Sequence, residues 1–248
     1  MRRMINLKKY IPAPVKLFLK LKARVAGDFF SGHHKLFCSA ANIQQQLYAH
    51  FKKVVYIEQI IKPADSSSNK IFNLSLAINK INNIKIGPGQ IFSFWKLVGE
   101  PSEKNEYKKS RSIINGELKN VAGGGLCQLS GLIYFLSLQT GLTIMERHPH
   151  SIDIYKEEER FTPLGSDATV AYGYKDCRVR NKYNFPIYFS FTLSDNLLTG
   201  TVAATENILL HKIEFEYEKH AGFTKVKTLS TCNKLPEIIA SHNYAILK

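Results

Sequence analysis

A cysteine follows three glycines at the start of an apolar segment, in the stretch GGGLCQLSGLIYFLSLQTGL, residues 123–142. The segment is long enough for a helix of several turns, which should begin near Leu126 or Cys127. Free backbone N–H groups and the helix dipole favour negative charge at that end, so the pKa of the Cys127 thiol should fall. The pattern therefore favours a thiolate nucleophile, and the same N–H groups could hold an oxyanion during acyl transfer.

Two histidines occur shortly after this helix, in the stretch ERHPHS. One residue separates His148 from His150, so an extended backbone would turn both to the same side, although Pro149 interrupts regular strand geometry. One imidazole suffices as a general base or a cationic partner for the thiolate. Either Asp153 or Asp167 could orient that imidazole and fix its tautomer.

The same residues also allow explanations without catalysis. Cysteine is among the most buried residue types, glycines such as Gly123, Gly124 and Gly125 can serve close packing, and histidines beside a proline can cap a loop. Alternatively, the glycines and the helix end could bind an anion without any chemistry. The pattern Gly-x-x-x-x-Gly-Lys-Ser/Thr is absent, which argues against a nucleotide P-loop.

The other three cysteines do not share this setting. Cys38, Cys177 and Cys232 lack a glycine-rich approach and a nearby pair of histidines, and we interpret them as packing residues. No Cys-x-x-Cys and no Cys/His cluster at zinc spacing occurs in the sequence. We therefore expect no structural metal and no cofactor.

The composition is that of a globular, strongly basic chain. Its 248 residues include 34 basic and 20 acidic side chains, a surplus of +14, and 44% of the residues are hydrophobic. This charge favours polyanions such as nucleic acid, anionic lipid or acidic cell-wall polymer. No nucleic-acid-binding motif is recognisable, so nucleic acid is not expected as a partner. No segment is continuous and apolar enough for a signal peptide or a bilayer span, which predicts a cytoplasmic protein.

The first 26 residues carry eight Lys or Arg and no acidic residue. Val15, Phe18, Leu19 and Val25 are spaced for one face of a helix. Two interpretations of this basic amphipathic helix remain open. The helix could lie on an anionic membrane surface, here the inner face, or it could dock on the protein and leave a basic side in solvent.

The remaining sequence predicts an α+β fold. Pro63 and the run ADSSSNK separate a basic helical N-terminal portion, residues 1–62, from a main domain, residues 63–205. Residues 206–248 form a C-terminal extension that we expect to pack on that domain. No long helix separates the strand-like segments after the cysteine helix, so the sheet should be mainly antiparallel and packed on this helix.

Several shorter patterns predict individual elements. Leu74 to Ile81 keep helical spacing, and the turn residues at 87–89 suit a hairpin, as do those at 115–116 and 195–196. The FSFW segment fits a strand whose phenylalanines are core residues. The predicted strands after the cysteine helix are LTIMERH, ATVAYGY, CRVRNKY, PIYFSFTL and LLTGTVAA, with HKIEFEYEK as a further candidate.

Three motifs, IGPGQIFSFWKLVGEP, GGGLCQLSGLIYFLSLQTGL and ERHPHSID, resemble the VanW-like family, which is associated with vancomycin-resistance clusters. The resemblance runs from about Asn69 to Phe191. The family patterns are Pro-Gly-x-x-Phe-Ser-Phe, Gly-Gly-Gly-x-Cys-Gln and Glu-Arg-x-x-His-Ser. They fall on Pro88, Gly89, Phe92, Ser93, Phe94, Gly123, Gly124, Gly125, Cys127, Gln128, Glu146, Arg147, His150 and Ser151.

This resemblance implies a cell-envelope context and favours His150, which occupies the family's regular position, over His148. Asp167 stands where other members carry glycine. Our first hypothesis is a thiol-dependent hydrolase or acyl/peptidyl transferase that acts on a cell-wall peptide or precursor. Cys127 would be the nucleophile, His150 the general base and Asp167 its orienting carboxylate, while Gln128 and backbone N–H groups would stabilise an oxyanion.

The alternative hypothesis is a non-enzymatic binding protein for an anionic cell-wall precursor or glycopeptide. The glycine turn would then hold the ligand, with polar contacts from Ser93 and stacking on Trp95. We also expect Arg147 and His148 among the ligand contacts. The sequence leaves open whether the protein is an enzyme.

Overall fold

The computed structural model describes residues 11–39, 51–62, 67–114, 117–153, 160, 162–232 and 235–246. Its architecture is α+β, as the sequence predicts, with antiparallel sheets and a small number of helices. The sheet that packs on the cysteine helix has the strand order β1-β10-β9-β2, with every neighbouring pair antiparallel. Its strands are β1 (Lys52–Ile60), β10 (Leu197–Ala204), β9 (Ile187–Ser194) and β2 (Ile84–Ile86).

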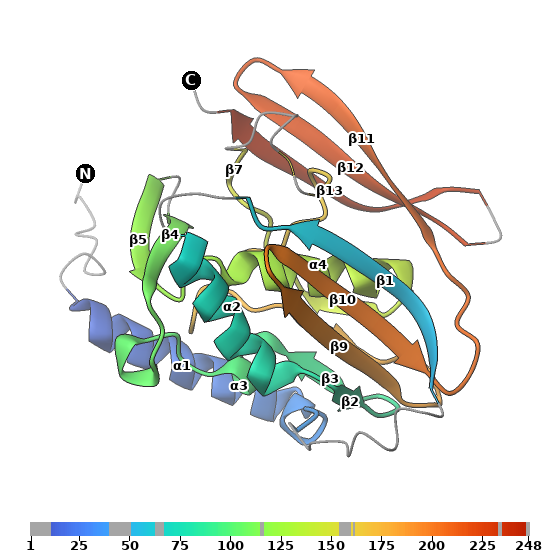
Figure 1. Cartoon of the computed structure of the whole chain (residues 1–248), viewed down its shortest axis with the longest axis horizontal. Helices are drawn as coiled ribbons and strands as arrows, with labels where there is room; N and C mark the ends of the chain where they lie inside the picture. The colour runs from blue at the N-terminus through green and yellow to red at the C-terminus, as the bar shows by residue number, and fades with distance from the viewer. Residues whose placement is uncertain are drawn as a thin grey trace, which may run out of the picture.

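The cysteine helix, α4 (Leu126–Gln139), packs on β1 and β10 of this sheet, and Figure 1 shows it lying across the far side of the strands. Gly200 of β10 makes the close approach possible, because a Cβ there would lie 2.8 Å from side-chain carbons of Leu132 and Leu136. Those leucines are fully buried, together with Leu129 and Ile133. The helix is therefore fixed inside the core rather than laid on the surface.

The N-terminal portion is not wholly helical. Residues 1–10 lie outside the described residues, and α1 (Ala13–Phe30) is the helix that the basic, apolar-spaced sequence predicts. Residues 52–60, however, form β1, which pairs with β10 along its length. A boundary at residue 62 would therefore separate an edge strand from its own sheet. The alternation of polar and apolar residues in KKVVYIEQI is short, and the strand that pairs with it lies far away in the sequence. The basic charge of the N-terminal portion is therefore the more evident local pattern.

The turn at residues 87–89 does not close a hairpin. It joins β2 to β3 (Ile91–Ser93), but β2 pairs with β9, whereas β3 pairs with β8 (Arg178–Arg180) in a second sheet of order β3-β8-β6. Asn181 donates hydrogen bonds to the carbonyls of residues 86 and 87 and so ties this turn to the strand end. The third strand, β6 (Thr143–Glu146), follows α4, as predicted.

Two further predictions fare differently. The hairpin of β4 (Lys109–Ile114) and β5 (Glu117–Ala122) is present, although its turn, residues 115–116, lies outside the described residues. The strand predicted at ATVAYGY is wrong. That segment is a turn with an isolated bridge between Ala171 and Lys175 and a positive φ at Gly173, against which Leu17 of α1 packs.

The C-terminal extension forms its own sheet, of order β11-β12-β13-β7 (upper part of Figure 1). The strands β11 (Lys212–His220), β12 (Phe223–Thr231) and β13 (Glu237–Ile246) are antiparallel, whereas the two-residue β7 (Ile152–Asp153) runs parallel to β13. Because β7 follows directly after the ERHPHS motif, this sheet lies beside the histidines. The remaining elements are α2 (Ser67–Ile81), α3 (Phe94–Val98), η2 (His33–Lys35) and η4 (Glu103–Asn105).

Candidate active site

Cys127 lies in the first turn of α4, where the sequence places it. Gly125 is the N-cap residue, in a left-handed conformation with a φ of 97°. The N–H of Gln128 donates to the carbonyl of Gly125, and the N–H of Leu126 donates to that of Gly123. The sulfur lies 3.9 Å from the carbonyl oxygen of Val170, and the residue is partly exposed. The thiol thus stands at the electropositive end of a buried helix, on a residue that is partly exposed.

The three glycines are required by packing on three sides. A Cβ at Gly123 would clash with Pro101, one at Gly124 with the carbonyl of Ser110, and one at Gly125 with the side chain of Lys70. The N–H groups of Gly123 and Gly124 already donate to the carbonyls of residues 108 and 121. The glycine turn therefore serves close packing, and these two N–H groups are engaged within the protein rather than offered to a ligand.

His150 lies close enough to Cys127 for each side chain to shift the pKa of the other. Its Nδ1 lies 2.7 Å from Oδ2 of Asp167, and its backbone N–H donates to the same oxygen at 2.6 Å. With Nδ1 held by the carboxylate, the other ring nitrogen, Nε2, is left for the thiol. The structure thus brings together Cys127, His150 and Asp167 in the order nucleophile, imidazole and orienting carboxylate.

Asp167 is itself held by two further side chains. Its Oδ1 accepts a hydrogen bond from Tyr244 at 2.6 Å and one from Nη2 of Arg147 at 3.0 Å. The same Arg147 donates from Nε to the main-chain carbonyl of Asp167 and from Nη2 to the carbonyl of Gly165 and to the Tyr244 hydroxyl. Arg147 is nearly buried, and these contacts position the carboxylate; that Arg147 also contacts a ligand stays a prediction.

These contacts shift the pKa values of His150, Cys127 and Asp167 so that each group favours its charged form. Burial lowers the pKa of His150, but the hydrogen bonds to Asp167 and Cys127 outweigh it and raise the value to about 10. Burial raises the pKa of Cys127, yet the hydrogen bond and the charge of His150 leave it below its ordinary 9.0. Burial raises the pKa of Asp167 as well, but His150, Arg147 and Tyr244 hold it well below its usual range. The shifts of the Cys127 and His150 pKa values both favour the ion pair, a thiolate beside an imidazolium, over the neutral thiol and imidazole.

The other expected site residues lie elsewhere. His148 bonds Glu146, with Nε2 3.0 Å from Oε1. The Gln128 side-chain amide donates to the carbonyl of Ile60 at the end of β1, so the group expected to hold an oxyanion is already engaged. Asp153, the other candidate orienting residue, forms an ion pair with Arg160.

The FSFW segment is buried in the core. Ser93 is 1% exposed and caps α3, since its hydroxyl accepts from the N–H of Lys96 and donates to Asp176 at 2.6 Å. Trp95 is buried, and its Nε1 donates to the carbonyl of Lys175. Neither side chain is placed to contact a ligand, so the structure lends nothing to the binding role that we considered for this segment. The strand predicted for FSFW ends at Ser93, and α3 begins at Phe94.

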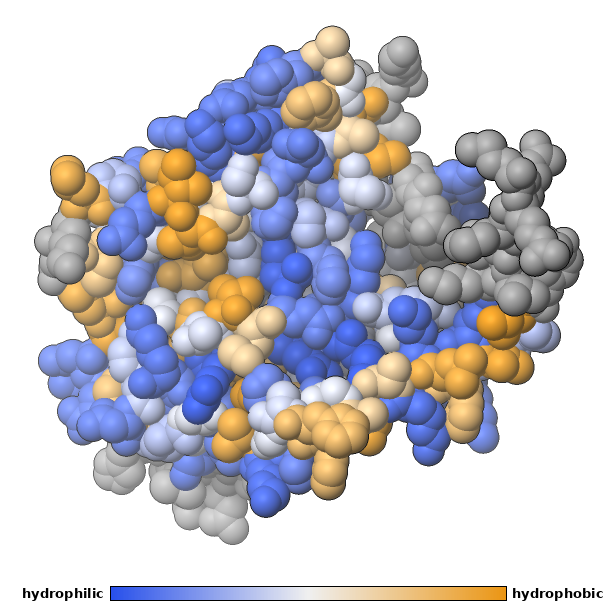
Figure 2. Space-filling view, turned by 180° about the vertical axis from the view of Figure 1, so that it is seen from behind, coloured by the Kyte–Doolittle hydropathy of each residue, from blue (hydrophilic) through white to orange (hydrophobic). Residues whose placement is uncertain are grey.

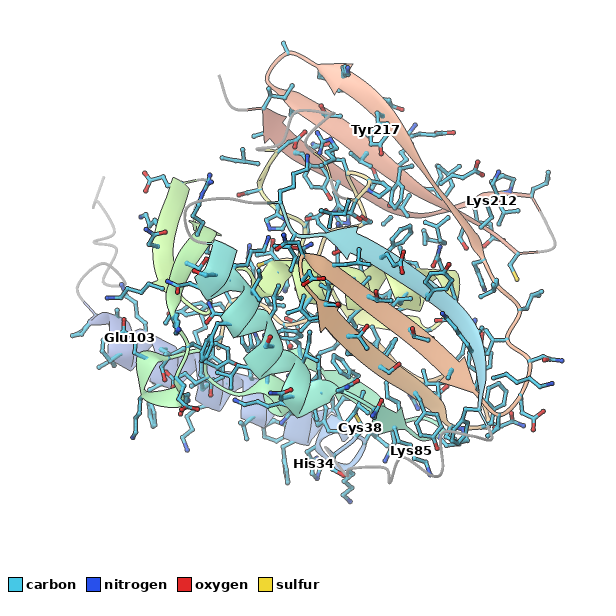
Figure 3. All side chains as sticks on the ribbon, viewed as in Figure 1. His34, Cys38, Lys85, Glu103, Lys212 and Tyr217 are labelled. Carbon is cyan, nitrogen blue, oxygen red and sulfur yellow. The ribbon has the colours of Figure 1, made fainter. Side chains whose placement is uncertain are left out.

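The remaining cysteines support the choice of Cys127. Cys38 and Cys177 are buried, and burial raises the pKa of Cys38 to about 12 and that of Cys177 further still. Figure 3 shows Cys38 near the ends of β2 and β3, and its N–H donates to the carbonyl of Ile91. Cys232 is partly exposed. Within the described ranges, no group of three or more His, Cys, Asp or Glu side chains could hold a metal ion.

Two residues of the site escape sequence reasoning. Tyr244 comes from β13 of the C-terminal extension, and the pattern SHNYAIL indicates only a strand. Lys70 of α2 packs its aliphatic stem against Gly125, and burial lowers its pKa to about 8, opposed by the charge of Cys127. A tyrosine in a strand and a lysine on a helix are common, so neither residue carries a sequence pattern that marks it as functional.

Comparisons with known proteins identify the family of this chain. A family model described as "VanW like protein" matches residues 69–203, which include all three residues of the triad. The vancomycin B-type resistance protein VanW of Enterococcus faecalis is 35% identical over 179 residues, 69% of this chain. The uncharacterized protein YoaR of Bacillus subtilis is 32% identical over 145 residues, 58% of this chain.

The matched segments cover 65% of VanW and 46% of YoaR, less than two thirds of either relative. No solved structure matches this chain. The family model covers more than half of the residues and includes the glycine turn, the cysteine helix and the ERHPHS motif. The chain therefore belongs to the VanW-like protein family.

Proposed function

We propose that this protein is a thiol-dependent hydrolase or acyl/peptidyl transferase that acts on a cell-wall peptide or precursor. The observation that carries the proposal is the chain of contacts from Cys127 through His150 to Asp167, closed by Arg147 and Tyr244. A buried carboxylate with this many partners restricts the imidazole to one orientation and one tautomer. This arrangement is typical of nucleophilic catalysis by cysteine.

The first step is acyl transfer to sulfur. The thiolate of Cys127 attacks a carbonyl carbon of the substrate, and the electron pair of the C=O bond moves to its oxygen. When the tetrahedral species collapses, the bond from carbon to the leaving group breaks, and the imidazolium of His150 gives its proton to the departing amine. The acyl group remains on Cys127 as a thioester, and His150 is neutral.

The second step returns the enzyme to its resting state. Neutral His150 removes a proton from water in a hydrolase, or from an acceptor amine in a transferase, and the oxygen or nitrogen attacks the thioester. The carbon–sulfur bond breaks, which restores the thiolate beside the imidazolium. Asp167 keeps its charge throughout and stabilises the cationic form of His150.

The oxyanion needs donors at the start of α4. We assign this role to the N–H of Cys127, which lies between two N–H groups already bonded within the first turn. A helix N-terminus supplies such donors without reorganisation. The side chain of Gln128 is not required, because its amide donates to Ile60.

The substrate class rests on the family and on charge. The relative in Enterococcus faecalis is named for vancomycin resistance, and we extend this to the chemistry of a cell-wall peptide or its precursor. The net charge of +14 suits an anionic precursor.

The proposal predicts selective alkylation of Cys127. Iodoacetamide should modify Cys127 below pH 8 faster than it modifies Cys232, because Cys127 has an imidazolium partner that lowers its pKa. Rates are measured for each thiol by mass spectrometry across a pH series. Replacing the partner, His150→Gln, should slow labelling of Cys127 by about tenfold or more at pH 7, since one pKa unit is a factor of ten in thiolate.

The Cys232→Ala variant is the matched control and should leave the Cys127 profile unchanged. Turnover of a cell-wall peptide should disappear in Cys127→Ala while thermal unfolding stays close to that of the wild type. Labelling of Cys127 no faster than that of Cys232 would contradict the proposal. Ligand binding that survives in Cys127→Ser, with no turnover in the wild type, would favour the non-enzymatic alternative.

A further inference from the structure

The outward side of α1 is apolar. Val15, Phe18, Leu19, Val25, Phe29 and Phe30 are all between 45% and 87% exposed, and we call these six residues the α1 apolar face. Most of them recur at intervals of three or four residues, which places them along one side of the helix. Figure 2 shows hydrophobic side chains along the lower right of the molecule, where α1 lies when Figure 1 is turned around.

The inward side of α1 is polar and fixed. Arg24 bonds Glu146 at 2.6 Å, and Asp28 receives two hydrogen bonds from Arg178, the shorter of 2.6 Å. Beside them, Leu17 meets Gly173. These ion pairs are partly buried and hold α1 in this orientation, so the helix does not roll to bury its phenylalanines instead. A surface helix usually turns its apolar side toward the protein, whereas α1 turns its apolar side toward solvent.

The exposed charges of α1 itself are of one sign. Lys20 and Lys22 are exposed on the same helix, and Lys22 lies 5.4 Å from the centre of the Phe18 ring. Asp28, the acidic residue of α1, is buried in its ion pair with Arg178. Two copies of the chain that met through this face would bring lysines together, whereas an anionic surface would complement them.

We propose that the α1 apolar face binds the surface of an anionic lipid bilayer. The helix lies in the interface, with its phenylalanines among the acyl chains and its lysines at the phosphate level. The described part of the chain contains no helix suited to crossing a membrane. The role that we assign to α1 is attachment along one face. It is independent of the triad and of the proposed reaction.

The test uses the full chain and phosphatidylcholine vesicles with and without phosphatidylglycerol. Wild-type protein should sediment with the anionic vesicles, and added salt should weaken the binding. The variant Phe18→Ser/Phe30→Ser should lose affinity about tenfold or more, because two aromatic side chains no longer leave water. Lys20→Gln/Lys22→Gln should weaken binding to anionic vesicles and reduce its salt dependence.

Matched controls carry the same chemical changes elsewhere. Leu209→Ser/Leu210→Ser removes two exposed leucines outside α1, and Lys85→Gln/Lys212→Gln removes two charges from strands seen in Figure 3. Both controls should bind like the wild type. Thermal unfolding and Cys127 labelling report whether each variant is folded and whether its triad is intact.

Equal loss of binding in the controls and in the α1 variants would overturn the proposal, because general charge or apolarity would then explain it. Unchanged binding of Phe18→Ser/Phe30→Ser would overturn it too. A wild-type dimer that this variant dissociates, without vesicle binding by either, would assign the face to a second copy of the chain and reject the membrane.

Discussion

Asp167 is the best-defined group of the site at the scale of single residues. Its carboxylate accepts four hydrogen bonds from side chains and backbone: two from His150, one from Arg147 and one from Tyr244. A buried carboxylate is costly unless its oxygens are fully used, and here each oxygen has two donors. The charge is thereby kept at neutral pH, and it keeps His150 protonated.

Tyr244 is the donor whose removal tests this arrangement with least disturbance. Tyr244→Phe keeps the buried ring and removes the hydroxyl that bonds Asp167 and Arg147. The pKa of Asp167 should rise, that of His150 should fall, and the pH at which Cys127 is half labelled should rise. We expect a loss of about 1–2 kcal/mol in the free energy of unfolding from the lost hydrogen bonds.

Tyr217→Phe is the control, since its hydroxyl bonds the carbonyl of Leu164 from another strand of the same sheet. It should leave the labelling profile of Cys127 unchanged. A Tyr244→Phe profile identical to that of the wild type would mean that Tyr244 contributes to stability but not to the acidity of the thiol.

The glycine turn before α4 matters at the scale of elements. It lets one helix end come within contact of α2 and β4, and that contact fixes where the sulfur stands. Gly125 has a φ of 97° and also faces the side chain of Lys70. Both the backbone conformation and the space therefore exclude larger residues at this position.

Gly125→Ala should lower the free energy of unfolding by about 2–4 kcal/mol and slow the labelling of Cys127, because φ strain and a steric clash act together. Gly222 has a φ of 89°, but a Cβ added there would meet nothing within 4 Å, so Gly222→Ala measures the φ strain alone. We expect a cost of about 1 kcal/mol there, without any change in labelling. Denaturant unfolding and alkylation rates check both. Equal costs at the two positions would mean that packing against Lys70 does not matter.

The sequence predicts an element correctly where neighbouring residues alone determine it. The helix after the glycines, the hairpin at Asp195 and the pairing of β4 with β5 depend on neighbouring residues, and all three are present. The turn at residues 87–89 has the composition of a hairpin, but strand pairing with β9 and β8 decides its outcome. The pairing of strands that are distant in the sequence leaves no signal in the local sequence of either strand.

The triad shows the same division. Short motifs single out Cys127 and His150, whereas the contact of Arg147 with Asp167 has no such signal. The role of Tyr244 has no sequence signal, because it depends on where the C-terminal sheet packs. Ser93 is ambiguous for another reason, since a helix cap and a ligand contact require the same hydroxyl.

The attachment of α1 connects distant parts of the whole molecule. The Glu146 carboxylate is hydrogen-bonded to Arg24, His148 and the N–H of Asp176. Burial raises its pKa, but these partners outweigh burial and lower the value to about 2. Its folded pKa lies below its ordinary 4.5. The stability that Glu146 contributes is therefore complete above pH 4.5 and is lost as the pH falls toward 2.

Glu146→Gln should reduce the free energy of unfolding at pH 7 by about 1–3 kcal/mol. The difference from the wild type should shrink as the pH falls from 4.5 to 2, because the wild-type carboxylate is then protonated. Chemical denaturation across this pH range measures it. Glu103→Gln, which removes an exposed ion pair with Lys109, should be nearly neutral at every pH. A difference that stays constant with pH would show that the Glu146 charge does not stabilise the fold.

The position of Tyr244 also bears on how such proteins diverge. The family model ends at residue 203, yet one hydroxyl that holds the triad carboxylate comes from β13, beyond that limit. Exchange of the C-terminal sheet for another appendage would alter the basicity of the imidazole while the motif around Cys127 stayed the same. Homologues with identical motifs could then work best at different acidities.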